Sequence, residues 1–357
     1  MPNYLLVDRP DDISQNLTGH ARVGVDTEFM REKTYFAQLC LIQISTPDHI
    51  YCADPLVENS QSAFWQALLD ASWVVHSARQ DIEVVSQTAH AMPREIFDTQ
   101  VAAGLLGMSA QVGYAGLVKE LFDVDMAKSH TRADWTRRPL KDEYLEYAAE
   151  DVEYLLPAAD ILCERLDQKG RLDWAEQDSA LLLDPALYSI SAAQAVERLK
   201  GARNFRGPRR AAAVRLAKWR EDEAIRRNRP RQWIIRDTVL LDIAYKLPTS
   251  EKQLADIDGM PPKTVGRAGQ QLLELVAASA KDEHGYEPPQ PPDEGQKALL
   301  KTMQSEVAAC AKDLEIAPET VASKRELSQV IISGVCDTRV FGGWRKDVIG
   351  SRLLQML

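Results

Sequence analysis

The stretch Arg22–Glu28, which reads RVGVDTE, decides how the first part of the chain folds. Its β-branched residues predict a strand that ends in two carboxylates, Asp26 and Glu28. Residues two apart on a strand point to the same face, so both acids are expected on one side of a sheet. Two acids on a largely buried strand are costly without a compensating charge, which a hard divalent cation such as Mg²⁺ supplies. The alternative is a strand end at the surface, where both carboxylates are simply hydrated.

Around this strand, further strand-like runs alternate with stretches whose apolar residues recur at helical spacing. Strands are predicted at Thr34–Ser45, His49–Asp54 and Ser72–His76, and helices at Ser60–Asp70 and Arg79–His90. This order predicts an α/β sheet covered by helices, and a mixed sheet because short turns join the first three strands. Beyond residue 113 the spacing is helical almost throughout, with long helices predicted at Lys141–Gln168 and Arg171–Leu183.

Two further groups of polar residues follow the first pair of acids. Asp81 falls in the first turn of the helix after His76, near Asp26 if their strands are neighbours. Tyr147 and Asp151 are four residues apart, so the hydroxyl and the carboxylate share one helical face. Both have ordinary alternatives: an acid in a first turn favours the helix dipole, and a tyrosine on an apolar face packs in a core. His76 is interpreted as a strand-end histidine bonded to the backbone, without a catalytic role.

The second half of the chain predicts small helical bundles. Helices are predicted at Arg209–Arg229, Asp237–Leu247, Ser250–Ile257 and Thr264–Ala280, with prolines between them. A proline-rich linker follows, and the last helical segment is broken at Pro318. We therefore expect one domain over residues 1–195, a helical domain over 205–283, a linker over 284–295 and a second helical domain over 296–357.

Charge divides the chain in the same way. Residues 1–200 carry a net charge of −15 and residues 201–283 carry +6, within a total of −10. Between Arg203 and Arg236 there are twelve basic residues and three acidic ones. This asymmetry favours a catalytic body that handles cations beside a module that binds a polyanion. The alternative is an arginine-rich helix face that is only hydrated.

Composition and motifs argue against several classes of protein. Five scattered cysteines without a CxxC pair argue against a disulfide scaffold or zinc cluster and for a reducing compartment. The uncharged run Thr99–Val118 contains four glycines and is expected to form two buried helical segments, not a membrane span. With no secretory signal in the sequence, a soluble, cytoplasmic protein without membrane contact is expected. No GxxxxGK[ST] pattern occurs, which excludes a helicase, and no obligate protein partner is evident.

Together the acids match a known pattern. Their set, with the tyrosine four residues before the last acid, resembles the tyrosine-containing branch of the DEDD exonuclease superfamily. The surrounding sequence is similar to the ribonuclease D family in three segments: GYAGLVKELF (Gly113–Phe122), KSHTRADWTRRPL (Lys128–Leu140) and YLEYAAEDVEYLL (Tyr144–Leu156). Trp219-Arg220, Arg227-Asn228 and Asp237 resemble that family's helicase-and-ribonuclease-D C-terminal (HRDC) module. The tail resembles a degenerate second copy of the module.

The resemblance implies a fold and an activity. The fold is a mixed-sheet, ribonuclease H-like α/β exonuclease domain followed by two small all-α helical-bundle domains. The activity is that of a 3′→5′ exoribonuclease that releases 5′-nucleoside monophosphates from the 3′ ends of tRNA precursors and other structured RNAs.

The resemblance also implies two bound Mg²⁺ or Mn²⁺ ions and assigns roles to the site residues. Asp26 would bridge both ions. Glu28 and Asp151 would complete one site, and Asp81 would lie at the other. Tyr147 would orient the attacking water, because a phenol is a poor base near neutral pH.

RNA contacts are expected in two places. Phe29 and Met30 directly follow the first acids and are expected to pack against terminal bases, although an ordinary core role fits them equally. The basic module is expected to hold the phosphate backbone. Its expected contacts are Arg206, Arg209, Arg210, Lys218, Arg220 and Arg227. Two alternatives remain open: a DNA 3′→5′ exonuclease of the same superfamily, because the acids do not read the 2′-hydroxyl, and a non-catalytic nucleic-acid-binding scaffold.

Overall fold

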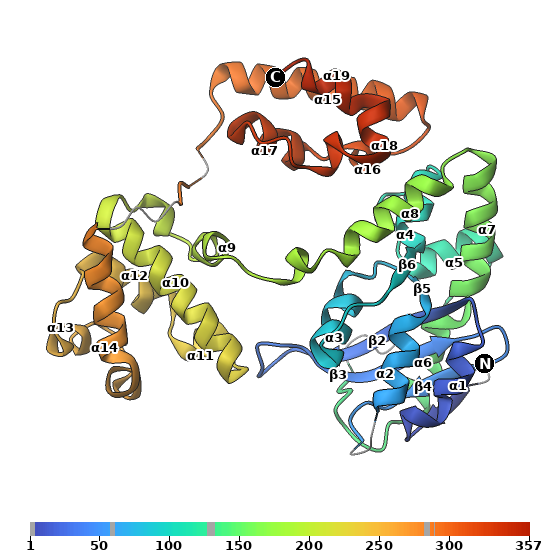
Figure 1. The fold of residues 1–357 in the computed structure, drawn as a ribbon, viewed down its shortest axis with the longest axis horizontal. Helices are drawn as coiled ribbons and strands as arrows, with labels where there is room; N and C mark the ends of the chain where they lie inside the picture. The colour runs from blue at the N-terminus through green and yellow to red at the C-terminus, as the bar shows by residue number, and fades with distance from the viewer. Residues whose placement is uncertain (1–3, 58–60, 127–132, 282–285, 289) are drawn as a thin grey trace. The chain divides into compact units, whose positions relative to one another are not determined.

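The structure is a computed structural model in which two compact units can be distinguished (Figure 1). It describes residues 4–57, 61–126, 133–281, 286–288 and 290–357. The first unit contains residues 1–30, 39–187 and 290–357, and the second contains residues 31–38 and 188–289. Residues 128–132 of one family-like segment, and residues 284, 285 and 289 of the predicted linker, lie outside the described residues.

A six-stranded sheet forms the centre of the first unit, in the order β1-β4-β3-β2-β5-β6 (Figure 1). β4 pairs parallel with β1 and antiparallel with β3, while β5 pairs parallel with both β2 and β6. The sheet is therefore mixed, which confirms the predicted fold class. The strands are β1 (Tyr4–Val7), β2 (Arg22–Met30), β3 (Gln38–Ser45), β4 (Ile50–Ala53), β5 (Ser72–Val75) and β6 (Glu95–Asp98).

Strand β3 shows where the predicted boundaries were wrong. After Gln38 every residue of β3 is buried, as expected for a central strand covered on both faces. The predicted strand began at Thr34, but the backbone N–H groups of Tyr35 and Phe36 both donate to Asn228 Oδ1, each at 3.0 Å, within the second unit. They are therefore not available to a strand ladder. Sequence patterns also missed β1 and β6, each only four residues long.

Helices α6 and α7 pack on the sheet beside β2 and position part of the site. One helix was predicted over Lys141–Gln168, but the structure has two helices with a break at Tyr154. The helix is interrupted there because Pro157 has no N–H to donate to the carbonyl of Glu153. The uncharged run forms α4 and α5, as predicted. No helix within the described residues combines the length and apolarity needed to cross a bilayer. The helices are α1 (Ser14–Thr18), α2 (Ser62–Asp70), α3 (Arg79–Ala89), α4 (Thr99–Leu105), α5 (Tyr114–Phe122), α6 (Asp142–Glu153), α7 (Leu155–Gln168) and α8 (Leu172–Ala180).

The C-terminal helices share a hydrophobic core with the sheet domain. Met303 and Leu353 are fully buried in the same cluster as Leu162 of α7. Beside this core, the buried Arg345 donates to both carboxylate oxygens of Asp178 in α8, at 2.5 and 2.7 Å. The elements are α15 (Glu294–Asp313), α16 (Pro318–Val321), α17 (Lys324–Ser333), α18 (Gly343–Arg345) and α19 (Ser351–Leu354).

The second unit is a bundle of helices around α10, which packs against α9, α12 and α14. Its core is built from small and branched residues such as Ala213, Leu240 and Leu272. Helix α10 ends at Asn228, whose φ of 46° places it in the left-handed region that stops a helix. The helices are α9 (Ala192–Glu197), α10 (Gly207–Arg227), α11 (Arg231–Ile234), α12 (Asp237–Lys246), α13 (Glu251–Ala255) and α14 (Pro262–Ala278).

A candidate active site beside strand β2

The five residues singled out for chemistry line one pocket of about 470 Å³ in the first unit. Strand β2 contributes Asp26 and Glu28, helix α3 contributes Asp81, and helix α6 contributes Tyr147 and Asp151. Asp81 is only 8% exposed, and the other three acids are half-buried. The fold therefore brings together residues that are up to 125 positions apart in sequence.

A tight turn between β5 and α3 aims Asp81 at the pocket. Ser77 lies in this turn with a φ of 60°, and its N–H donates to a carboxylate oxygen of Asp98 at 3.1 Å. The N–H of Ala78 donates to the other oxygen of Asp98 at 2.9 Å. Thr27 Oγ1 then donates to Asp81 Oδ1 at 2.5 Å, which ties α3 to the middle of β2. The bonded turn before α3 and the Thr27 hydroxyl thus together orient Asp81.

Tyr147 and Asp151 interact along α6. The Tyr147 hydroxyl donates to the Asp151 carboxylate, as their four-residue spacing allows. Burial, together with the negative charges of Asp151 and Glu28, holds the pKa of Tyr147 far above its usual value. The hydroxyl therefore keeps its proton at neutral pH and serves as a donor that orients its neighbours.

The pKa values of all four carboxyl groups are raised. Burial is the main cause, and it raises the pKa of Glu28 to about 8, that of Asp151 to about 7 and that of Asp81 to about 6. The pKa of Asp26 lies well above its usual value because of burial and the charges of Asp81, Asp151 and Glu28. No Lys or Arg is among the described residues that line the pocket. The site thus concentrates negative charge that nothing in its lining balances.

Divalent metal ions fit this ligand chemistry. Carboxylate oxygens are the donors that Mg²⁺ and Mn²⁺ prefer, and a bound cation would remove the repulsion that raises these pKa values. Across the described residues, no three His, Cys, Asp or Glu side chains already converge as a complete ligand set. The acids instead stand along the walls of an open pocket, with Asp81 and Asp151 held by hydroxyl groups.

His76 and Tyr114 also line this pocket. His76 Nε2 lies 2.9 Å from the carbonyl oxygen of Val112 and its Nδ1 lies 2.9 Å from Thr99 Oγ1, so both ring nitrogens are bonded. This agrees with the structural role predicted for it. The Tyr114 hydroxyl accepts from the backbone N–H of Tyr154 at 3.0 Å. Sequence reasoning missed Tyr114, because no spacing relates it to the acids.

The expected base-packing residues differ from each other. Phe29 lines the pocket beside Glu28. Met30 packs instead against a buried cluster that contains Trp135 and Leu145, which is the ordinary core role considered above.

The basic residues of the second unit divide into exposed and internal groups. Arg206 and Arg209 are exposed, and the Arg209 guanidinium lies 4.1 Å from the centre of the Tyr245 ring. Arg220 is 2% exposed and donates to Asp237 and to the carbonyl of Ile235.

Arg210 is similarly internal, 6% exposed, and pairs with Glu287 at 2.5 Å. Because these two guanidinium groups are bonded inside the bundle, we withdraw Arg210 and Arg220 from the expected RNA contacts. Lys218 and Arg227 form ion pairs along α10.

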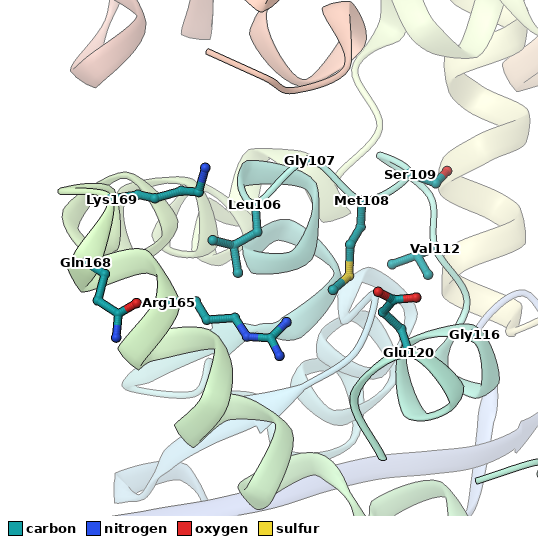
Figure 2. A pocket seen from close by; sticks show the side chains of 10 residues that line it. All are labelled: Leu106, Gly107, Met108, Ser109, Val112, Gly116, Glu120, Arg165, Gln168 and Lys169. Atoms are coloured by element: carbon teal, nitrogen blue, oxygen red, sulfur yellow. The ribbon is translucent and has the colours of Figure 1, made fainter. Parts of the chain in front are cut away.

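A second cavity of the first unit is larger, about 610 Å³, but has different chemistry. It lies between the α4–α5 connection, α5 and α7, where Met108 stands among Glu120, Arg165 and Lys169 (Figure 2). One acid beside two basic residues gives it a mixed charge. None of the four clustered acids reaches it, so cavity size does not identify the candidate active site.

Known families and proteins are similar to this chain over most of its length. Residues 7–167 match the family described as 3′-5′ exonuclease, and residues 209–276 match the HRDC domain family. Proteins named ribonuclease D include one from Gluconacetobacter diazotrophicus, 35% identical over 99% of this chain and 93% of its own length. Another, from Xanthomonas oryzae pv. oryzae, is 32% identical over 100% of this chain and 99% of its own.

A solved structure extends the match to three dimensions. The crystal structure of Escherichia coli RNase D, described as an exoribonuclease involved in structured RNA processing, has a TM-score of 0.88 to this chain. The two chains are 26% identical, and the match covers 99% of this one and 98% of the other. Identity above 30% over nearly the full length of these relatives, together with the two family matches in this chain, leads to one conclusion. The chain belongs to the ribonuclease D family of 3′→5′ exoribonucleases.

Proposed function

We propose that this exoribonuclease depends on two divalent metal ions held by the four pocket carboxylates. We further propose that it releases 5′-nucleoside monophosphates from the 3′ ends of tRNA precursors and other structured RNAs. One observation carries the metal dependence: four carboxylates line one pocket to which the described residues contribute no Lys or Arg. The exonuclease superfamily generally uses divalent metal ions, which supports the same interpretation.

The side chains of the pocket divide the work. Asp26, Glu28, Asp81 and Asp151 would hold the ions, which would supply an activated water and neutralise the charge that develops on the leaving 3′-oxygen. Asp26 interacts electrostatically with all three other acids, Asp81, Asp151 and Glu28, which suits the bridging role. Thr27 keeps Asp81 oriented through its hydrogen bond. Tyr147 keeps its proton, and its hydroxyl is available to orient the attacking water.

The proposed substrates rest on the family and on charge. The Escherichia coli relative is described as acting in structured RNA processing. In this chain, residues 201–283 carry a net charge of +6 and include the exposed Arg206 and Arg209, which suits contacts with a phosphate backbone. A DNA substrate is the second candidate, because the four acids do not distinguish a 2′-hydroxyl.

The test uses a tRNA precursor labelled at its 5′ end and carrying an unpaired 3′ extension. With Mg²⁺ or Mn²⁺ we expect a ladder of products shortened from the 3′ end, with 5′-nucleoside monophosphates released. EDTA should stop the reaction, and a 3′-phosphate should block its start.

Two matched substrates serve as controls. A DNA strand of the same sequence should be degraded more slowly; faster degradation of DNA would reverse the substrate assignment. A circular RNA should stay intact, since internal cuts would indicate a different class of nuclease. Full activity in EDTA would contradict the metal proposal.

A further inference from the structure

Two contacts fix how β3 lies against β2, its neighbour in the sheet. A Cβ placed on Gly24, early in β2, would lie 2.2 Å from Ser45 Oγ at the end of β3. At the other end of the pair, the Cys40 thiol hydrogen-bonds to the backbone of Met30. The strands therefore run antiparallel, with Gly24 opposite Ser45. Counting two residues along each strand places Gln43 opposite Asp26.

Gln43 therefore lies next to the proposed bridging acid. Side chains of directly opposed residues lie on the same face, with Cβ atoms about 4.5–5.5 Å apart. On its other side Gln43 is paired with Cys52 of β4. Cys52 packs with Ala148 and Ala149 of α6. The Gln43 side chain is thus on the face that α6 covers, between Asp26 and a thiol.

The amide of Gln43 is unusual in this setting. Gln43 is 0% exposed, yet among the described residues neither its Nε2 nor its Oε1 has a hydrogen-bond partner. Buried polar groups are nearly always bonded, and its chain neighbours Ile42 and Ile44 are apolar. An aliphatic side chain would fill this space without leaving two polar atoms unpaired. The position thus holds an amide donor that no described side chain or backbone group engages.

We propose that Gln43 is a positioning residue for metal binding, in which its amide N–H donates to the ionised carboxylate of Asp26. The proposal rests on the metal dependence proposed above. An amide donor orients the carboxylate without adding charge, whereas a lysine would neutralise it and compete with the cation. Such supporting hydrogen bonds change metal affinity by about 10- to 100-fold when they are removed.

The test compares Gln43→Leu with Ser45→Ala in the full-length chain. Leucine keeps the approximate shape of Gln43 and removes the donor. Ser45 is the matched control, because its Oγ is also buried and unpaired on the same strand but lies opposite Gly24. Mn²⁺ affinity is measured by titration followed by electron paramagnetic resonance, without RNA, and thermal unfolding is measured in EDTA.

We expect Gln43→Leu to bind Mn²⁺ about 10- to 100-fold more weakly, with unfolding in EDTA unchanged or shifted to higher temperature. Ser45→Ala should bind Mn²⁺ as the wild type does. Equal affinity in Gln43→Leu and the wild type would overturn the proposal, as would equal weakening in both variants.

A wild type that binds no Mn²⁺ would instead refute the proposed metal dependence itself, so the two failures are distinguishable.

Discussion

Asp178 and the four acids of the candidate active site have contrasting electrostatic surroundings within the first unit. Asp178 of α8 is 9% exposed, and Arg345 donates to both of its carboxylate oxygens, while Trp344 Nε1 donates to one of them at 3.2 Å. The four pocket acids are buried or half-buried, but the described residues lining their pocket include no cation. The same unit thus contains a buried acid paired with an arginine and four acids whose described pocket lining supplies no balancing charge.

The difference separates a structural acid from a functional one. Asp178 and Arg345 connect the C-terminal helices to the sheet domain, where a paired charge fixes one arrangement. Removing one member of such a pair leaves an uncompensated buried charge. The pocket acids reduce stability as long as they are ionised and unpaired, and a cation from solution relieves that cost. Substitutions at the two places should therefore have opposite effects on stability.

The largest effect is expected for Asp26→Asn. Loss of the proposed bridging carboxylate should lower the rate of RNA shortening by about 10³-fold or more, because metal ions contribute several kcal/mol to transition-state stabilisation. The same substitution should raise the unfolding temperature in EDTA, since it removes a repelled carboxylate. Both are checked by single-turnover assays and thermal unfolding. A variant that is inactive and also destabilised in EDTA would indicate misfolding and contradict the comparison.

Tyr147→Phe should have the next largest effect. It keeps the ring and deletes the hydroxyl that is bonded to Asp151, so turnover should fall by about 10²–10⁴-fold, as when a positioned proton-handling group is lost. Mn²⁺ affinity should change little. Tyr144→Phe, one turn earlier on α6 and not part of the pocket lining, is the matched control and should keep full activity. If both variants keep full activity, Tyr147 is a core aromatic residue.

Asp178→Asn tests the paired acid. The substitution replaces the carboxylate by a neutral amide, so the buried Arg345 guanidinium loses the negative charge of Asp178. The expected loss is about 3–5 kcal/mol in the free energy of unfolding. Urea denaturation of the full-length chain measures this loss. Asp173→Asn, an exposed acid on the same helix, should change stability by less than about 0.5 kcal/mol. The folded fraction of Asp178→Asn should cleave a short oligonucleotide at the wild-type rate, because the site does not include α8.

Short-range patterns predicted the elements that carry the site. Alternation along Arg22–Glu28 predicted that Asp26 and Glu28 share a face, and helical spacing predicted the same for Tyr147 and Asp151. These rules work because they depend only on the geometry of a single strand or helix. That the four acids are catalytic stays a prediction until the variants above are measured.

Features set by tertiary packing could not be predicted in this way. The sequence of the basic stretch shows where arginines occur, but not whether their side chains face solvent or the core. Arg220 points into the bundle because Asp237 and the carbonyl of Ile235 accept its hydrogen bonds there. Gln43 lies within an apolar run, so only the pairing of β3 with β2 places it next to Asp26. The common core of Met303 and Leu162 likewise depends on residues 141 positions apart.

The smallest expected effect is a pH dependence of stability that metal removes. In the metal-free protein the pKa values of Asp81, Asp151 and Glu28 are raised to about 6, 7 and 8, above those of the unfolded chain near 4. Between about pH 4 and pH 8 the folded state binds more protons than the unfolded state. We therefore expect the free energy of unfolding in EDTA to fall as pH rises through this range.

Saturating Mg²⁺ should flatten that dependence, because the cation replaces the protons and keeps the carboxylates ionised at no cost in repulsion. Urea denaturation at several pH values, with Mg²⁺ or with EDTA, measures both curves. Asp26→Asn should make the EDTA curve shallower, since it removes one of the mutually repelling acids. Identical slopes with and without Mg²⁺ in the wild type would mean that no cation binds these acids.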